Sequence, residues 1–168
     1  EFFIYSFGKD ESIKWHNLLK KNVDKFSDVT NFSFQEILEM TQKDSLDIAI
    51  DLMGFTKNNR LGIFKNRIAP IQINYLGYPG TIGADYFDYI IADRILIPQD
   101  QKKFYSENII YMPNSYQPND NEIIVPDLNS TKSDHGLPND GVVFCCFNQN
   151  YKIGITEFNI WMRILKKI

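Results

Sequence analysis

The stretch INYLGYPGTIGADYFDYIIAD, residues 73–93, contains two apolar runs separated by a loop rich in glycine. The whole chain has nine glycines, and three of them, Gly77, Gly80 and Gly83, occupy every third position of this loop. Pro79 and Gly80 suit the two central positions of a type II turn, in which the second central residue has a positive φ. Either the loop is a plain turn after a strand, or its uncovered backbone N–H groups approach a sugar or a phosphate.

Short apolar runs alternate with polar segments along the rest of the chain as well. Ser33 and Glu36 have the spacing of a capping box and predict the start of a helix. Further helices are predicted near Asp10 and Thr156, with a short one within residues 57–66. Short strands separated by helices indicate a parallel, doubly wound α/β sheet. The predicted strands cover residues 1–7, 46–55, 71–76, 87–93, 108–113 and 141–149.

The composition excludes several classes of function. The 168 residues are 43% hydrophobic and carry a net charge of −3, which gives no basic surface for nucleic acid or for a membrane. No apolar run approaches the roughly 20 residues that span a bilayer. The two histidines are far apart and the two cysteines, Cys145 and Cys146, are adjacent, so no metal-ligand spacing is present. We expect these cysteines to lie unpaired in the core of a strand, and the protein to reside in the cytoplasm.

Residues 114–140 contain Pro, Asn, Asp and Ser without hydrophobic periodicity, which predicts a linker. The strand and helix predicted beyond this linker would begin a second sheet. Because the chain lacks an initiator Met and its last residues, NIWMRILKKI, stop within a predicted helix, we expect a fragment of a longer protein.

Ligands of open α/β sheets bind beyond the carboxyl ends of the strands. That rule selects three loops of this chain, residues 54–60, 77–83 and 148–154. The loop at 77–83 has the spacing G-x-x-G-x-x-G, which is neither the dinucleotide-binding G-x-G-x-x-G nor a P-loop. NAD and ATP sites are therefore not supported.

Polar and charged side chains stand in the other two loops. Thr56, Lys57 and Arg60 follow a predicted strand, and Gln149 and Lys152 precede a predicted helix. Such residues are most often solvated. A lysine beside the partial positive charge of a helix N-terminus, however, also suits a diphosphate. On that interpretation Gln149 hydrogen-bonds the same diphosphate, and Lys57 or Arg60 lies near an anionic donor or an acceptor chain.

Four segments resemble, in this order, parts of the O-linked N-acetylglucosamine transferases, also called the SPINDLY/O-GlcNAc transferase family. They are DLMGFTKNNR, RIAPIQINYLGYPGTIGADYFDYIIAD, IIYMPNSYQPND and GLPNDGVVFCCFNQNYKI. The resemblance is strong over residues 46–168 and weaker over residues 1–45. Its most specific parts are A-P-I-Q…L-G-Y-P-G-T-x-G and F-N-Q-x-Y-K.

This resemblance implies a glycosyltransferase B architecture, in which two Rossmann-like domains face a nucleotide-sugar cleft. Residues 1–118 would form the later part of the N-terminal catalytic domain, residues 119–135 a linker, and residues 136–168 the first strand and helix of the C-terminal domain. The animal enzymes carry a long insertion between the two halves, so the short connection here resembles that of bacterial members.

The resemblance also implies the roles of site residues. The loop at 77–83 would line the donor-sugar pocket, Gln149 and Lys152 would hold the diphosphate, and Tyr151 would pack near the sugar. Phe55 stands where the family's G-Y-T-K-x-x-R segment has a tyrosine. Lys152 would be catalytic, and the implied substrate-binding residues are Thr56, Lys57, Arg60, Leu76, Gly77, Tyr78, Pro79, Gln149, Tyr151 and Lys152.

The reaction that the resemblance implies is inverting transfer of N-acetylglucosamine from UDP-N-acetylglucosamine to Ser or Thr hydroxyls of proteins. Lys152 and a helix N-terminus would stabilise the departing UDP, so no metal cofactor is expected. The family's histidine-bearing H-P-x-x-H segment, its nucleobase pocket and the tetratricopeptide repeats of many members have no counterpart in these residues. We therefore expect the catalytic base to lie elsewhere and the fragment alone to be inactive.

Two other functions stay open. Protein O-fucosyltransferases that use GDP-fucose resemble G-Y-P-N-T where this chain has Gly80 in the fourth position. A non-catalytic α/β scaffold module that has kept the fold is the other alternative, although such a module has no need of a diphosphate-binding Gln149 and Lys152.

Overall fold

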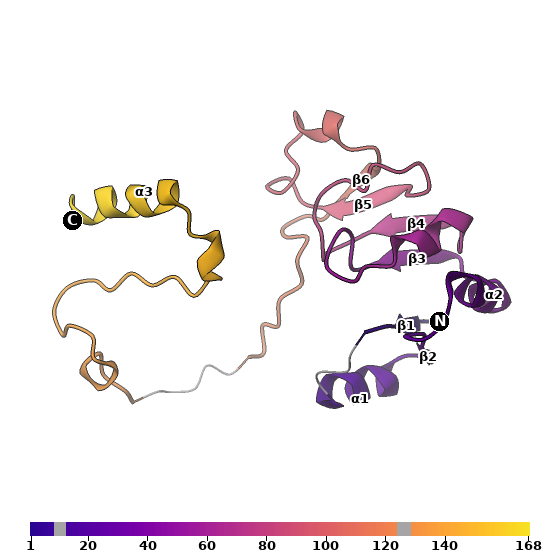
Figure 1. Ribbon diagram of the computed structural model, residues 1–168, viewed down its shortest axis with the longest axis horizontal. Helices are drawn as coiled ribbons and strands as arrows, with labels where there is room; N and C mark the ends of the chain where they lie inside the picture. The colour runs from indigo at the N-terminus through magenta and orange to yellow at the C-terminus, as the bar shows by residue number, and fades with distance from the viewer. Residues whose placement is uncertain (9–12, 124–128) are drawn as a thin grey trace. The chain divides into compact units, whose positions relative to one another are not determined.

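The computed structural model describes residues 1–8, 13–123 and 129–168. The chain divides into two compact units, Glu1–Asp120 and Asn121–Ile168. Figure 1 colours both units along the chain, from indigo at the N-terminus to yellow at the C-terminus. Within the described ranges, no helix is both long enough and apolar enough to cross a bilayer.

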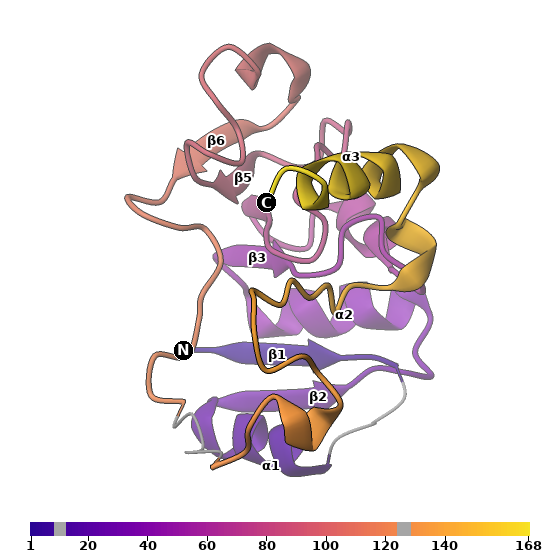
Figure 2. The ribbon, with the colours of Figure 1, turned by 90° about the vertical axis from the view of Figure 1, so that its left-hand side faces the viewer.

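Six short strands form two parallel sheets in the first unit (Figures 1 and 2). One sheet pairs β1 with β2, the other has the order β3-β4-β5-β6, and every pair of neighbours is parallel. This arrangement confirms the predicted parallel α/β class. The strands are β1 (Phe3–Ser6), β2 (Lys25–Asp28), β3 (Ile48–Asp51), β4 (Ile71–Asn74), β5 (Tyr89–Ala92) and β6 (Asn108–Tyr111).

Sequence patterns located all of these strands except β2. The sequence of β2, KFSD, has a single apolar residue between a lysine and a serine. It therefore shows neither a continuous apolar run nor a clear alternation. Its position is fixed by pairing instead, since each residue from Lys25 to Asp28 lies beside a residue of β1.

The strands are connected by α1 (Ile13–Asn22), α2 (Phe34–Asp44) and the 3-10 helices η1 (Leu61–Asn66) and η2 (Lys102–Phe104). The predicted capping box is present: Ser33 Oγ accepts the Glu36 N–H at 3.2 Å, and the Glu36 carboxylate accepts the Ser33 N–H at 2.7 Å. These bonds satisfy two N–H groups at the start of α2. The cap predicted at Asp10 lies outside the described residues.

Gln72, the glutamine of the A-P-I-Q segment, is fully buried in β4. Its Oε1 accepts the Ile68 N–H at 2.9 Å, and its Nε2 donates to the carbonyls of Phe64, at 3.0 Å, and Tyr86. A buried amide is tolerated only when its polar atoms are paired. This side chain ties η1 and the segment before β5 to β4, so Gln72 has a structural role.

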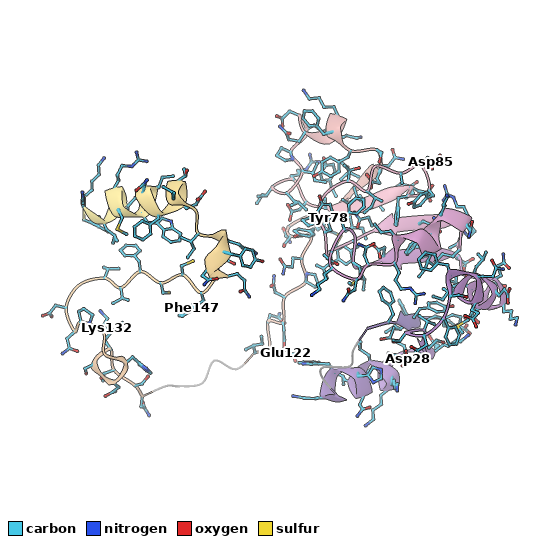
Figure 3. All side chains as sticks on the ribbon, in the orientation of Figure 1. Asp28, Tyr78, Asp85, Glu122, Lys132 and Phe147 are labelled. Atoms are coloured by element: carbon cyan, nitrogen blue, oxygen red, sulfur yellow. The ribbon has the colours of Figure 1, made fainter. Side chains whose placement is uncertain are left out.

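The second unit contains η3 (Ser133–His135), η4 (Asn150–Lys152) and α3 (Ile155–Leu165). α3 begins after an N-cap at Gly154, slightly earlier than the start predicted at Thr156. In Figure 3, Phe147 marks the segment that leads to η4, and its side chain is 96% exposed.

The strand predicted over residues 141–149 is wrong, because this segment has no regular secondary structure. A strand is stable when a neighbour pairs with its backbone, and the described part of the second unit contains no strand to pair with. Cys145 and Cys146 are consequently exposed rather than in a core, and both are free thiols.

Replacing Gln72 with leucine should lower the free energy of unfolding by about 2 kcal/mol or more, because the Ile68 N–H and the Tyr86 carbonyl lose their buried partner. Gln42→Leu, on the exposed surface of α2, is the matched control and should change stability by less than about 0.5 kcal/mol. Urea denaturation measures both variants. Equal stabilities of Gln72→Leu and Gln42→Leu would contradict the structural role.

Candidate functional site

Two loops meet beyond the carboxyl ends of β3 and β4, at the end of the sheet toward which both strands point (Figures 1 and 3). We call residues 52–60 the β3 loop and residues 75–83 the β4 loop. The rings of Phe55 and Tyr78 contact each other edge to face, with centroids 5.5 Å apart. Parallel strands place their following loops at one edge, where ligands of α/β sheets bind.

Two glycines allow these loops to approach each other closely. A Cβ atom on Gly77 would lie closer to the Leu52 carbonyl oxygen than the 3.0 Å that real Cβ contacts keep. A Cβ atom on Gly54 would overlap the Cβ of Tyr78 in the same way. Packing between the loops therefore requires glycine at position 77, whether or not its N–H also meets a ligand.

The backbone of the β4 loop differs from the predicted type II turn. Positive φ angles occur at Leu76, 74°, and at Gly83, 69°, and not at Gly80. The turn prediction is wrong because it placed the left-handed residue by sequence preference alone. A leucine with positive φ is uncommon and costs about 1–3 kcal/mol, and such residues persist where their surroundings over-determine them, often at ligand sites.

Two buried side chains fix the β4 loop. Asn74, fully buried, donates from Nδ2 to the Gly80 carbonyl at 3.0 Å. Glu107, 3% exposed, accepts the Ile82 N–H and the Thr81 hydroxyl, each at 2.6 Å. Hydrogen bonds to an ionised carboxylate are stronger than those between neutral groups. Side chains that do not belong to the loop therefore hold its C-terminal half, at Gly80, Thr81 and Ile82.

No sequence pattern indicated these two supporting side chains. Asn74 is one polar residue within an apolar strand, and Glu107 is a single acid before the next strand. Asn74 bonds a carbonyl 6 residues further along the chain, whereas Glu107 bonds an N–H group 25 residues away. No local spacing of residues encodes the contact of Glu107.

The β3 loop begins with a tight turn at Asp51, which is 5% exposed. The Asp51 carboxylate accepts the Gly54 N–H. Burial raises the pKa of Asp51, and the N–H groups of Gly54 and Met53 oppose this rise.

The polar residues predicted in the β3 loop have different surroundings. Arg60 donates from its guanidinium to the carbonyls of Val29, at 2.8 Å, and Phe32, and the rings of Phe7 and Phe34 lie 5.6 and 5.3 Å from it. Arg60 thus ties the loop to the connection between β2 and α2, a structural role that the sequence did not reveal. Its contact with a substrate stays a prediction.

Thr56 and Lys57 lie nearer the tip of the β3 loop. Thr56 is half-buried, and its carbonyl accepts the Asn59 side-chain amide at 2.9 Å. Lys57 is exposed. Both remain accessible to a ligand at this edge of the sheet, and their roles in binding are predictions.

The residues predicted to hold a diphosphate lie in the second unit. Gln149, Tyr151 and Lys152 are all exposed, in or beside η4, and α3 begins three residues after Lys152. The 11-residue helix α3 carries Glu157 in its first turn, where a carboxylate also interacts favourably with the N-terminus. Lys152 thus precedes a helix as predicted, and its contact with a diphosphate stays a prediction.

No group of three or more His, Cys, Asp or Glu side chains within the described residues is arranged to hold a metal ion. Lys57 and Arg60 carry positive charge in the β3 loop of the first unit. Lys152 carries positive charge before α3 in the second unit.

Parallel strands connected by helices define a Rossmann-like α/β protein. In such a protein the ligand binds beyond the carboxyl ends of the strands, where the β3 and β4 loops lie. The profile of the family described as "Glycosyl transferase family 41" matches residues 1–130 and 121–168. The chain belongs to this family, as its resemblance to the O-GlcNAc transferases indicated.

Three comparisons show how closely the chain resembles known members. A probable UDP-N-acetylglucosamine–peptide N-acetylglucosaminyltransferase SEC of Arabidopsis thaliana is 35% identical over 173 residues, covering 100% of this chain and 18% of that protein. A SPINDLY protein of Solanum lycopersicum, with the same probable activity in its name, is 30% identical over 92% of this chain and 16% of its own length. The structure of a mutant Thermobaculum terrenum O-GlcNAc transferase has a TM-score of 0.80 and 29% identity, covering 98% of this chain and 30% of that one.

These matches cover nearly the whole chain but less than a third of each relative. The activity of the whole protein, its substrates and its partners are therefore matters for a proposal.

Gly77→Ala should destabilise the protein more than Gly83→Ala does. The first substitution pushes a methyl group into the Leu52 carbonyl, whereas a Cβ on Gly83 meets no atom within 4 Å and adds only the strain of a positive φ. We expect about 1 kcal/mol for Gly83→Ala and at least about 2 kcal/mol for Gly77→Ala. Thermal unfolding of both variants measures the difference, and a Gly77→Ala protein as stable as the wild type would show that the loops are not packed as described.

Proposed function

We propose that the full-length protein transfers N-acetylglucosamine from UDP-N-acetylglucosamine to Ser or Thr hydroxyls of proteins, and that this chain supplies part of the donor site. The observation that carries the proposal is the β4 loop, which Asn74 and Glu107 hold rigid beyond the carboxyl end of β4. Membership of glycosyl transferase family 41 and the activity printed in the names of the relatives support it.

In this proposal the two loops bind the sugar and the second unit binds the diphosphate. Leu76, Gly77 and Pro79 contact the hexose, whose hydroxyls suit exposed backbone groups, and Tyr78 covers it. Rigid donors and acceptors lose little entropy when they meet the ligand, which favours binding at such a loop. Thr56, Lys57 and Arg60 line the neighbouring surface, where an acceptor chain or the donor's negative charge lies.

The proposed reaction inverts the sugar centre. The acceptor oxygen forms a bond to the anomeric carbon as the bond to the UDP oxygen breaks, and the hydroxyl proton passes to a base outside these residues. Negative charge grows on the departing diphosphate, and Lys152, with Gln149 and the N–H groups at the start of α3, stabilises it. Tyr151 packs against the sugar. No metal ion is required when a lysine and a helix N-terminus supply this charge.

The remaining parts of the proposal concern partners and location. Protein acceptors with Ser or Thr, and tetratricopeptide repeats elsewhere in the full-length chain, are the proposed partners. Two free, exposed thiols favour a reducing compartment, and we place the protein in the cytoplasm.

Lys152→Ala in the full-length protein should reduce the release of UDP from UDP-N-acetylglucosamine by about 100- to 1000-fold, because a positive charge beside the leaving group is lost. Lys166→Ala, beyond the last residue of α3, is the matched control and should keep wild-type activity. A nucleotide-release assay with a Ser/Thr-rich protein acceptor measures both. Full activity of Lys152→Ala would contradict the proposal that Lys152 stabilises the departing diphosphate.

The same assay separates the alternative functions. Release of GDP from GDP-fucose, with no release of UDP, would identify a protein O-fucosyltransferase. Release of neither nucleotide, together with no binding of UDP in a titration, would identify a scaffold.

The 168-residue chain alone should show no turnover with UDP-N-acetylglucosamine, since the proposed base lies outside it. The full-length protein in the same assay is the positive control. Turnover by the isolated chain at a rate near that of the full-length protein would contradict the proposal that the catalytic base lies outside these residues.

A further inference from the structure

The segment that follows β6 begins the connection between the two units. Residues 112–120 are exposed except for Tyr116, which is half-buried. Figure 1 shows this segment passing the carboxyl ends of β5 and β4, the edge of the sheet at which the β4 loop lies. Tyr116 is therefore the residue at which the connection packs against the first unit.

Two side chains hold the backbone of Tyr116. The Asp93 carboxylate, directly after β5, accepts the Tyr116 N–H at 2.9 Å, and the Tyr75 hydroxyl, directly after β4, donates to the Tyr116 carbonyl at 2.8 Å. These partners are 23 and 41 residues apart in the sequence. Because both polar backbone groups of one residue are bonded, the chain is fixed at this point. We call Tyr75, Asp93 and Tyr116 the linker clamp.

Asp93 provides a firm attachment for the connection. The residue is buried, and its carboxylate also accepts the N–H groups of Ile95, at 2.9 Å, and Leu96, at 2.8 Å. The N–H groups of Leu96, Tyr116 and Ile95 hold the pKa of Asp93 below its ordinary value. Asp93 is therefore ionised at neutral pH, and its hydrogen bond to Tyr116 is of the charge-assisted kind.

Tyr75 belongs to the β4 loop as well as to the linker clamp. Its carbonyl accepts the Gly77 N–H at 3.0 Å, and its own N–H donates to the Asp51 carbonyl of β3 at 2.9 Å. The residue between Tyr75 and Gly77 is Leu76, with its positive φ of 74°. A shift of Tyr75 would therefore displace the backbone of Leu76 and Gly77.

The two halves of the β4 loop are thus held by different parts of the chain. Asn74 and Glu107 bond its C-terminal half, at Gly80, Thr81 and Ile82. The N-terminal half is tied through the Tyr75 hydroxyl to the connection between the units.

We propose that Tyr75 is a positioning residue for the sugar donor, because its bond to the connection at Tyr116 fixes the N-terminal half of the β4 loop. This inference rests on the proposed function, in which Leu76 and Gly77 contact the hexose. Without the hydroxyl these two residues sample more conformations, so binding the sugar costs more conformational entropy. The nucleotide is assigned to other residues. The linker clamp therefore acts on the affinity for the sugar part of the donor.

Tyr75→Phe in the full-length protein removes the hydroxyl and keeps the ring. The Kd for UDP-N-acetylglucosamine should rise about 5-fold, the usual effect of one lost hydrogen bond, and the Kd for UDP should change less than about 2-fold. Isothermal titration calorimetry measures both ligands. Equal losses of affinity for the two ligands, or no loss for UDP-N-acetylglucosamine, would overturn the positioning role.

Tyr111→Phe is the matched control for this titration. The Tyr111 hydroxyl also donates to a backbone carbonyl, that of Ile97 at 3.1 Å, and it lies outside the linker clamp. Both affinities should therefore stay at their wild-type values. The same selective loss in Tyr111→Phe would assign the effect to general loosening of the first unit and overturn the proposal.

Hydrogen exchange resolved to single amides tests the linker clamp without any ligand. In the full-length protein, Tyr75→Phe should speed the exchange of the Tyr116 and Gly77 amides about 5-fold or more. The amides of β5 should stay as slow as in the wild type, which shows that the sheet remains folded, and Tyr111→Phe should change neither Tyr116 nor Gly77. Unchanged exchange at Tyr116 and Gly77 in Tyr75→Phe would overturn the linker clamp.

The two measurements also separate this inference from the proposed function. A wild-type protein that binds neither UDP-N-acetylglucosamine nor UDP would contradict the proposed function, and with it the role of Tyr75 toward the sugar. The exchange measurement would still decide whether Tyr75 ties the β4 loop to the connection.

Discussion

The close approach of two backbone segments, at Leu52 and Gly77, is the constraint on which the candidate site depends. Only a glycine fits against the Leu52 carbonyl, and the strands that carry these segments are neighbours in the sheet. The two loops therefore pack against each other at the end of the sheet. Asn74 and Glu107 hold the C-terminal half of the β4 loop in place.

Much of this arrangement was predictable from local sequence. The apolar runs at 71–76 and 87–93 form β4 and β5, and Ser33 caps α2 through the predicted hydrogen bonds with Glu36. These features depend on residues that are close in sequence, so a short pattern contains them. The position of the β3 and β4 loops also followed, because it needs only the order and direction of the strands.

Other features depend on distant contacts and could not be predicted. The roles of Arg60 and Glu107 require carbonyls and N–H groups more than 20 residues away. The segment 141–149 has the apolar composition of a strand but no neighbouring strand within the described part of its unit. Its exposed Val142 and Phe144 show that composition alone does not form a strand when no partner is present.

Strand pairing follows the same principle in the first unit. Within the described residues β1 pairs with β2 and β3 pairs with β4, so the position of each strand depends on its neighbour. The resemblance to the O-GlcNAc transferases provided the chemistry that the described residues alone do not specify.

A crystal structure of the full-length protein with bound UDP-N-acetylglucosamine tests the central claim most directly. The distance to measure is that between the hexose and the backbone of residues 76–80. We predict hydrogen-bond distances there, with the diphosphate beside Lys152. A sugar bound away from the β4 loop, with Leu76 to Gly80 in contact only with protein, would contradict the account.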